Sequence, residues 1–251
     1  MRFLLVTDLD NALIGDNRAT IALYQKLIPY RKRFCLIYAT GRSMLSVKDL
    51  TRSFQKMTGD WLLEPDYLIT GVGSEIYGQD GLDREWAERL TKNWQRTAIA
   101  NLLKSFPDLS LQPPSEQNLW KLSYYVESSH NAAAVESIRN LLTNVGLPAQ
   151  IAFSSNRDLD ILPVNGGKGN AVNYLRSKLE LSIDATLVCG SSGNDISLFE
   201  QQTLGVMLSN SQKELLDWHQ SHRLSQHYLA RSPYGWGIIE ALDHFKMLAY
   251  M

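Results

Sequence analysis

The sequence predicts an α/β fold in which a doubly wound parallel sheet carries an inserted α/β domain. Two observations lead to this prediction. Short apolar runs without clean polar alternation recur along the chain, and such runs are typical of strands buried on both faces of a parallel sheet. The runs alternate with longer amphipathic stretches of helical spacing, which is the order of βαβ units.

The apolar runs are the expected strands of the larger domain. They are Phe3–Thr7, Phe34–Tyr38, Tyr67–Thr70, Thr186–Cys189 and Leu204–Leu208. Helical patterns are found at about residues 18–30, 43–57, 168–179 and 194–202. Because helices separate the strands, we expect the strands to be parallel. Residues 1–78 and 161–251 are therefore predicted to form one core domain.

The segment from 79 to 160 has a different pattern. A long amphipathic stretch over Asp83–Phe106 precedes a strand pattern at Leu119–Val126. A helical pattern at Asn131–Asn144 and a second strand pattern at Ala149–Ser154 follow. The earlier α/β order resumes after Leu162. We therefore predict a small α/β domain inserted into the core.

Composition argues against several classes of partner. The 25 Lys and Arg residues nearly balance the 26 Asp and Glu residues, so the formal net charge is −1. Nucleic-acid binding usually shows as an excess of basic residues, and none is expected here. No apolar stretch approaches the roughly 18 residues that span a bilayer, and Asp8 interrupts the first apolar run. We expect no membrane partner and a cytoplasmic location.

Two carboxylates follow the first predicted strand. In Asp8-Leu9-Asp10-Asn11, strand alternation points Asp8 and Asp10 in the same direction. They lie beyond the carboxyl end of a parallel strand, where open α/β sheets bind their ligands. Two neighbouring carboxylates repel, and Mg²⁺ with its preference for oxygen ligands relieves that repulsion. A solvated turn is the alternative interpretation of this motif.

Three more polar motifs stand at strand ends or helix starts. Ala39-Thr40-Gly41-Arg42 offers a hydroxyl, a backbone N–H and a guanidinium, which suit a phosphate. Gly166-Gly167-Lys168-Gly169-Asn170 brings a lysine to a helix start from a glycine-rich turn. Cys189-Gly190-Ser191-Ser192-Gly193-Asn194-Asp195 follows the fourth strand. Each motif alone is a weak indication of a site that binds phosphate and metal, and the four in this order are a strong one.

The four motifs in this order resemble those of the haloacid dehalogenase superfamily. That resemblance implies a Rossmann-like core with an inserted cap and a Mg²⁺-dependent phosphatase. It implies that Asp8 is the nucleophile, which splits one displacement into two easier steps. It also implies that Asp10 is the general acid and base, and that Thr40 and Lys168 hold the phosphoryl oxygens. The implied metal ligands are Asp8, Asp10, Ser191 and Asp195.

Further motifs narrow the resemblance to the sucrose-6-phosphate phosphatases of cyanobacteria and plants. These motifs are Gly73-Ser74-Glu75-Ile76-Tyr77, Trp120-Lys121-Leu122-Ser123-Tyr124 and Ser154-Ser155 followed by Asp158-Leu159-Asp160. In that family the inserted segment is a cap that selects the sugar. The resemblance implies that substrate is bound by Thr40, Gly41, Arg42, Glu75, Lys121, Asp158 and Asn194. Read without the resemblance, Lys121 is an exposed strand residue.

Two positions depart from the family pattern. Ser191 stands where the fourth motif normally has an aspartate that binds Mg²⁺, and a serine hydroxyl is a neutral, weaker ligand. Ala12 stands where the first motif usually has a threonine. Three hypotheses therefore stand. In the first, the chain is a sucrose 6-phosphate phosphatase that is weakened at its metal site. In the second, it is a non-catalytic relative that binds a sugar phosphate or a partner such as sucrose-phosphate synthase. In the third, it is a phosphatase for another sugar phosphate.

Overall fold

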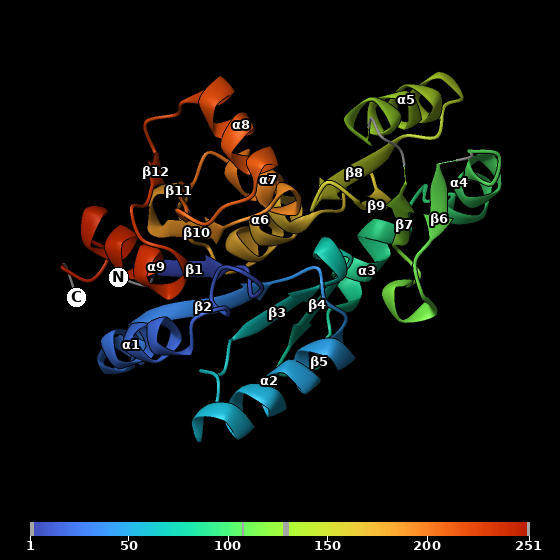
Figure 1. Cartoon of the computed structure of the whole chain (residues 1–251). Helices are drawn as coiled ribbons and strands as arrows, with labels where there is room; N and C mark the ends of the chain where they lie inside the picture. The colour runs from blue at the N-terminus through green and yellow to red at the C-terminus, as the bar shows by residue number, and fades with distance from the viewer. Residues whose placement is uncertain (1–2, 107, 128–130, 250–251) are drawn as a thin grey trace.

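The protein, described by a computed structural model over residues 3–106, 108–127 and 131–249, is built on two sheets (Figure 1). An eight-stranded sheet forms the core, in the order β12-β11-β10-β1-β2-β3-β4-β5. Its strands are β1 (Phe3–Thr7), β2 (Phe34–Ala39), β3 (Tyr67–Thr70), β4 (Glu75–Gly78), β5 (Gly81–Leu82), β10 (Thr186–Gly190), β11 (Leu204–Met207) and β12 (His227–Leu229). The five predicted strands are all present, and their bounds agree to within one residue.

The core sheet is parallel from β12 to β3, which confirms the predicted doubly wound α/β class. The strands β4 and β5 extend one edge in antiparallel orientation. This edge was not predicted because neither strand contains an apolar run that stands out from its surroundings.

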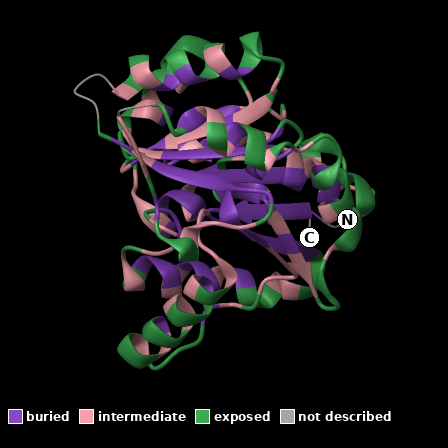
Figure 2. Cartoon of the chain, turned by 90° about the vertical axis from the view of Figure 1, so that its right-hand side faces the viewer, coloured by how far each residue is buried: buried purple, intermediate pink, exposed green. Residues whose placement is uncertain are grey.

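Helices cover both faces of the core sheet (Figure 1). One face carries α1 (Asn17–Leu27), α2 (Met44–Thr58) and α9 (Tyr234–His244). The other carries α3 (Arg84–Thr91), α6 (Lys168–Lys178), α7 (Ile196–Phe199) and α8 (Lys213–His222). Side chains of β1 alternate between the two faces of the sheet. Leu5 packs into the apolar cluster under the first group of helices, while Leu4 and Val6 pack into the cluster under the second. Figure 2 shows the resulting buried centre, with exposed residues on the outer sides of the helices.

The inserted segment forms a four-stranded antiparallel sheet in the order β6-β7-β9-β8. The strands are β6 (Leu109–Leu111), β7 (Leu122–Val126), β8 (Ala149–Ser154) and β9 (Asp158–Pro163), and α4 (Arg96–Leu103) and α5 (Asn131–Asn144) pack against them. The predicted order of helix, strand, helix, strand therefore misses β6 and β9. The stretch Asp83–Phe106 divides into α3 and α4, with Asn93 between them in the left-handed region at φ 64°.

The exact division into core and cap remains a prediction. β9 continues to Pro163, past the predicted boundary at residue 160. Trp86 and Leu90 of α3 pack with the apolar cluster of the core. We use "cap" for the segment 79–160 and "core" for the remainder.

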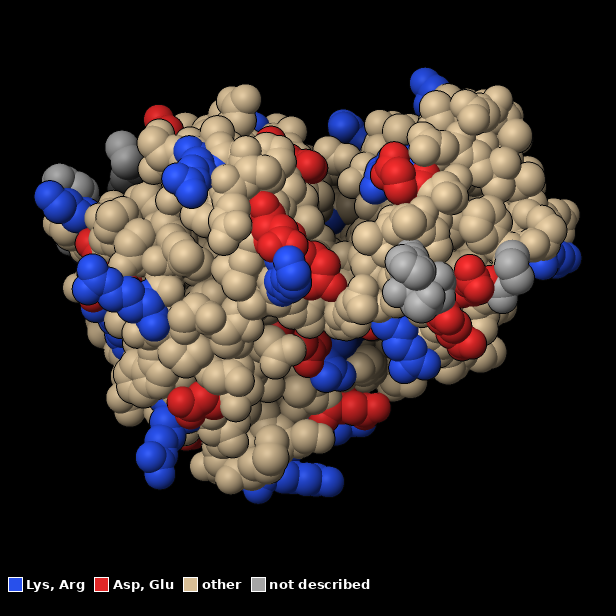
Figure 3. Space-filling model, turned by 45° about the horizontal axis from the view of Figure 1, so that its top comes forward, with Lys and Arg blue, Asp and Glu red and all other residues tan. Residues whose placement is uncertain are grey.

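The cap lies beyond the carboxyl ends of β1, β2 and β10, on the right of Figure 1. Figure 3 shows a notch between the core on the left and the cap on the right, and side chains of both charge signs are scattered over the face in view. Among the described residues, no helix is both long enough and apolar enough to cross a membrane. The arrangement leaves the carboxyl edge of the sheet facing the cap.

Candidate active site

A cavity of about 290 Å³ lies between the carboxyl edge of the core sheet and the cap. Seven of the predicted site residues line it: Asp8, Asp10, Gly41, Arg42, Lys121, Asp158 and Asn194. Four more lie behind its wall with no exposed surface, namely Thr40, Lys168, Ser191 and Asp195. The structure therefore brings together motifs that are far apart in the sequence.

Asp8 lies directly after β1 and is only 4% exposed. Its backbone N–H donates to the Cys189 carbonyl at 3.0 Å, so the two strand ends are fixed side by side. Burial, together with the nearby Asp195, raises the pKa of the Asp8 carboxyl to about 7 against the opposing effect of Lys168. A carboxylate in this position depends on neighbouring positive charge to be ionised.

Lys168 supplies that charge at the start of α6. Its Nζ lies 3.1 Å from Asp8 Oδ1 and 2.7 Å from Asp195 Oδ1, with no exposed surface. Burial by itself lowers the pKa of the ammonium, but Asp195 and Asp8 outweigh it and raise the pKa overall. The lysine therefore stays charged between two buried carboxylates.

Asp195 organises the loop that follows β10. Its Oδ2 accepts the backbone N–H groups of Ser191 at 2.9 Å and Ser192 at 3.0 Å. Its other oxygen binds Lys168. Because both oxygens already have partners, this carboxylate holds the loop and the lysine in place.

Asp10 is held from the side by Arg42. Arg42 Nε donates to Asp10 Oδ2 at 2.7 Å, and its Nη2 donates to Oδ1 at 2.8 Å. Such paired hydrogen bonds fix both the position and the plane of a carboxylate. Arg42 is itself tied to Ser46 Oγ at 2.7 Å, near the start of α2. The guanidinium that was predicted to bind phosphate thus reaches the predicted general acid.

The motif after β2 places Thr40 and Gly41 beside this pair. The buried Thr40 Oγ1 accepts the Arg42 backbone N–H at 3.2 Å. The nearest heavy atom to a side chain built on Gly41 would be Asn194 Nδ2 at 3.6 Å. Gly41 and Asn194 are therefore neighbours in the wall of the cavity, one from each of two strand ends.

The oxygens around Ser191 fit Mg²⁺ in type, although they carry little charge. Ser191 Oγ donates to the Asp10 main-chain carbonyl at 3.2 Å, so these two oxygens lie together at the second residue after Asp8. Mg²⁺ is commonly bound by one or two carboxylates with waters and substrate phosphate. Among the described residues, no group of three His, Cys, Asp or Glu side chains is placed to hold a metal. One carboxylate with neutral oxygens is a ligand set that fits Mg²⁺ but would bind it weakly.

Ala12, the other departure, is fully buried in the apolar cluster below β1. Its N–H donates to the Leu9 carbonyl at 3.3 Å, which closes the turn after the strand. The turn therefore forms without the hydroxyl that the family usually has at this position.

On the cap side, Lys121 is 3% exposed and is not the surface residue that its strand pattern suggests. Its Nζ donates to Asp160 Oδ1 at 3.2 Å, and Ser123 Oγ donates to the same oxygen at 2.5 Å. Asp158, on the same strand as Asp160, accepts from Gln112 Nε2 at 3.3 Å. Burial, and then the proximity of Asp160, raises the pKa of Asp158. The roof of the cavity is thus a row of polar groups, of which Asp158 is half-buried and the others are buried.

Glu75 lies outside this cavity, in a neighbouring one of about 220 Å³. It accepts from Thr70 Oγ1 at 3.0 Å. The two cavities have Glu116 and Lys121 in common. A ligand longer than one sugar ring could therefore extend from Asp8 to Glu75.

Several residues that line the cavity were not predicted, among them Gln112, Glu116 and Gln212. The first two lie in or beside a short 3₁₀ helix of the cap, Pro114–Glu116, whose sequence shows no strand or helix pattern. Gln212 follows β11, and the rule that ligands bind at strand ends could have indicated it.

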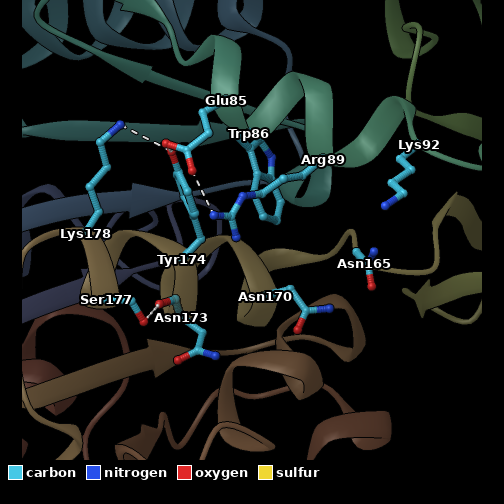
Figure 4. A pocket seen from close by; sticks show the side chains of 10 residues that line it. All are labelled: Glu85, Trp86, Arg89, Lys92, Asn165, Asn170, Asn173, Tyr174, Ser177 and Lys178. Carbon is cyan, nitrogen blue, oxygen red and sulfur yellow. Dashed lines mark hydrogen bonds and ion pairs between the residues drawn. The ribbon is translucent and has the colours of Figure 1, made fainter.

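A separate hollow of about 720 Å³ lies between α3 and α6 (Figure 4). Its charged side chains are largely paired. Arg89 donates to Glu85 at 2.8 Å and lies over the Tyr174 ring, and Lys178 binds Asp83 at 2.8 Å. None of the predicted site residues lines this hollow, so we place the candidate active site in the smaller cavity.

Several known proteins are similar to this chain. A solved sucrose-phosphatase from Synechocystis sp. PCC6803, in complex with sucrose and phosphate, is 44% identical with a TM-score of 0.93, over 98% of this chain and 99% of that one. Probable sucrose-phosphatase 2 of Arabidopsis thaliana is 35% identical over 98% of this chain. Mannosylfructose-phosphate phosphatase of Agrobacterium fabrum is 30% identical over 97% of each chain.

The chain spans 60% of the length of the Arabidopsis relative. The family model for sucrose-6F-phosphate phosphohydrolase matches residues 1–246. The resemblance drawn from the motifs is thereby confirmed, and the chain belongs to the sucrose-6F-phosphate phosphohydrolase family.

Proposed function

We propose that this chain hydrolyses sucrose 6-phosphate to sucrose and phosphate through an aspartyl phosphate on Asp8. The observation that carries the proposal is the cavity, which places Asp8 opposite buried polar groups of the cap. One ligand can therefore present its phosphate to the core and its hydroxyls to the cap. The Synechocystis relative, which was solved with sucrose and phosphate, supports this substrate.

In the first step, an Asp8 carboxylate oxygen attacks the phosphorus and the bond to the sugar oxygen breaks. Lys168 binds Oδ1, which leaves Oδ2 for the attack. Asp10 gives its proton to the departing sugar oxygen. In the second step, Asp10 takes a proton from water, the water oxygen attacks phosphorus, and Asp8 is released with free phosphate.

Arg42 has to loosen its hold before Asp10 can transfer a proton, because it engages both carboxylate oxygens. A bound phosphoryl group competes for the guanidinium, since phosphate also forms paired hydrogen bonds with arginine. Substrate binding would thereby free Asp10 at the step that needs it.

We propose Mg²⁺ as the cofactor, held by Asp8, the Asp10 main-chain carbonyl and Ser191, with Asp195 fixing the loop behind them. When bound, the ion supplies positive charge against the phosphoryl oxygens. The aspartate missing at Ser191 predicts weak affinity for the ion.

Two other functions stay open on specific observations. Ser191 favours a non-catalytic protein that binds a sugar phosphate. The match to a mannosylfructose-phosphate phosphatase favours a different disaccharide phosphate. Association with sucrose-phosphate synthase and a cytoplasmic location remain predictions of the sequence.

The test is phosphate release from sucrose 6-phosphate across a Mg²⁺ titration, with Ser191→Asp and Asp8→Asn beside the wild type. We expect turnover that Asp8→Asn abolishes, and a Mg²⁺ midpoint about 10- to 100-fold lower in Ser191→Asp. A silent wild type with an active Ser191→Asp would show a phosphatase scaffold without activity, and the binding function would replace the enzyme. Running mannosylfructose phosphate in parallel separates the two substrates.

A further inference from the structure

The cap touches the core through the turn between β8 and β9. The turn closes with the Arg157 N–H donating to the Ser154 carbonyl at 3.1 Å. Its two central residues, Ser155 and Asn156, have φ of 56° and 47°, as in a type I′ turn. Their N–H groups have no role in the strand pairing of the cap, so they need acceptors from elsewhere.

The start of α8 in the core supplies those acceptors. The Ser155 N–H donates to Gln212 Oε1 at 3.1 Å, and Gln212 Nε2 donates back to Ser155 Oγ at 3.1 Å. The Asn156 N–H donates to Glu214 Oε1 at 2.7 Å. We call these four residues, Ser155, Asn156, Gln212 and Glu214, the cap latch.

The cap latch is joined to the loop that carries the proposed metal ligand. The Gln212 backbone N–H donates to the Ser191 carbonyl at 2.7 Å. Two residues along that loop, Gly193 packs so closely against the Phe153 carbonyl of β8 that a Cβ there would lie 2.1 Å from the oxygen. The position of the cap turn and the position of the Ser191 loop are therefore set by the same contacts.

The cap latch also borders the candidate active site. Ser155 and Gln212 both line the cavity that contains Asp8. At another point of the seam, Asn118 Nδ2 of the cap donates to Ser74 Oγ of the core at 2.7 Å. The latch bonds are exposed to solvent, and an exposed hydrogen bond changes an equilibrium by only about 2- to 10-fold. A seam of this kind can open and close during each turnover.

We propose that the cap latch holds the cap closed over the sugar phosphate, and that Gln212 is a positioning residue for the reaction. The inference rests on the proposed function. A closed cap lets binding energy from the remote sugar orient the phosphate ester and exclude water. Gln212 positions the two parts by binding Ser155 of the cap on one side and Ser191 of the core on the other.

Glu214→Ala tests the latch without touching the cavity, because Glu214 does not line it. We expect kcat/KM for sucrose 6-phosphate to fall about 3- to 10-fold, as for one lost hydrogen bond. For p-nitrophenyl phosphate, which has no sugar for the cap to hold, we expect a change below about 2-fold. Glu214→Gln keeps an oxygen acceptor and should restore the wild-type value.

Gln212→Ala removes two latch bonds and is expected to have the larger effect on the sugar phosphate. The matched control is Gln220→Ala, which changes an exposed glutamine on the same helix, about 12 Å further along. Equal loss in Gln212→Ala and Gln220→Ala would contradict a specific role for Gln212, as would equal loss on both substrates in Glu214→Ala.

Amide hydrogen exchange gives a readout that does not depend on turnover. In wild type we expect protection at Ser155 and Asn156, and faster exchange by about 10-fold or more in Gln212→Ala/Glu214→Ala, with Gln220→Ala unchanged. Identical exchange in the double variant and wild type would overturn the latch. If wild type hydrolyses neither substrate, the proposed function fails, and the exchange experiment still decides the latch.

Discussion

Lys168 is enclosed by protein and shares its charge between Asp8 and Asp195. Removing one partner of a buried ion pair costs far more than the pair contributes, because the remaining charges are left uncompensated. We predict that Lys168→Met lowers the free energy of unfolding by about 3–5 kcal/mol. Denaturant titration near neutral pH, without added metal, measures this change.

The same helix offers a control for that prediction. Lys178 of α6 also binds a carboxylate, that of Asp83, at 2.8 Å, but its side chain is 45% exposed. Exposed pairs contribute little, so Lys178→Met should change the free energy of unfolding by less than about 1 kcal/mol. Similar losses in both variants would show that the contribution of Lys168 to the free energy of unfolding does not depend on its burial.

The buried ring of His227 makes the folding stability of the protein depend on pH. Burial, together with the nearby His219, lowers the pKa of its ring to about 4, and the Phe199 backbone acts in the opposite direction. A base whose pKa is depressed on folding stabilises the protein above its unfolded pKa of 6.5, and that stabilisation is lost as the pH falls toward 4. Below pH 6.5 the unfolded state therefore binds more protons.

We predict that wild type loses about 1–2 kcal/mol more than His227→Phe between pH 7.5 and pH 5, after allowance for partial screening by solvent. Urea titrations of both proteins at the two pH values give the difference. His244→Gln, at an exposed histidine, should follow the wild type. Parallel curves for wild type and His227→Phe would rule out the buried ring as the cause.

The strand-end rule predicted which motifs come together, although the roles of their residues stay predictions. Asp8, Asp10, Arg42 and Asn194 all line the cavity, because parallel strands bring their carboxyl ends to one edge. The burial of Lys121 could not be predicted from the local strand pattern, because it depends on Asp160 in another strand. A partner 39 positions away leaves no trace in local periodicity.

At the scale of elements, the core strands could be predicted because burial on both faces produces uninterrupted apolar runs. The cap could not be predicted as well, since its sheet is covered on one face and its strands β6 and β9 are short or polar. The split between α3 and α4 depends on a left-handed Asn93 and on Trp94, whose Nε1 donates to the Leu119 carbonyl at 2.9 Å. That contact is tertiary and is not visible in the sequence.

Gly193, in the loop after β10, packs against the cap. Its φ lies outside the left-handed region, so the main obstacle to a side chain there is the Phe153 carbonyl oxygen, 2.1 Å from a Cβ, with Glu214 Cβ next at 3.3 Å. We predict that Gly193→Ala folds, yet loses about 100-fold in kcat/KM for the sugar phosphate because the cap cannot close fully. Circular dichroism checks the fold, and steady-state kinetics checks the loss.

Gly41→Ala serves as the control for closure, because a Cβ there has no neighbour nearer than 3.6 Å. Amide exchange in the β8–β9 turn should rise in Gly193→Ala and stay at the wild-type rate in Gly41→Ala. An unchanged turn in both variants would mean that the loop yields and the cap still closes.

For the whole molecule, a ligand that bridges core and cap should stabilise both together. In Asp8→Asn, which lacks the nucleophile, sugar phosphate at 100 times its Kd should add about 2.7 kcal/mol to the stability. For a chain of this size that corresponds to a rise in Tm of about 5–10 °C. Differential scanning fluorimetry measures it, and the unphosphorylated disaccharide should give a smaller rise. The absence of any shift would contradict both the enzymatic and the binding hypotheses.

The two sheets differ in how much free strand edge they offer to another molecule. The core sheet ends in β12 and β5, which are three and two residues long, and such short edges present few unpaired backbone groups. The cap sheet has a longer edge in β8, of six residues, whose Phe153 carbonyl is covered by Gly193 when the cap is closed. Closing the cap therefore also covers one backbone acceptor of this edge, and we expect edge-to-edge association in concentrated solution to be lowest when a ligand keeps the cap closed.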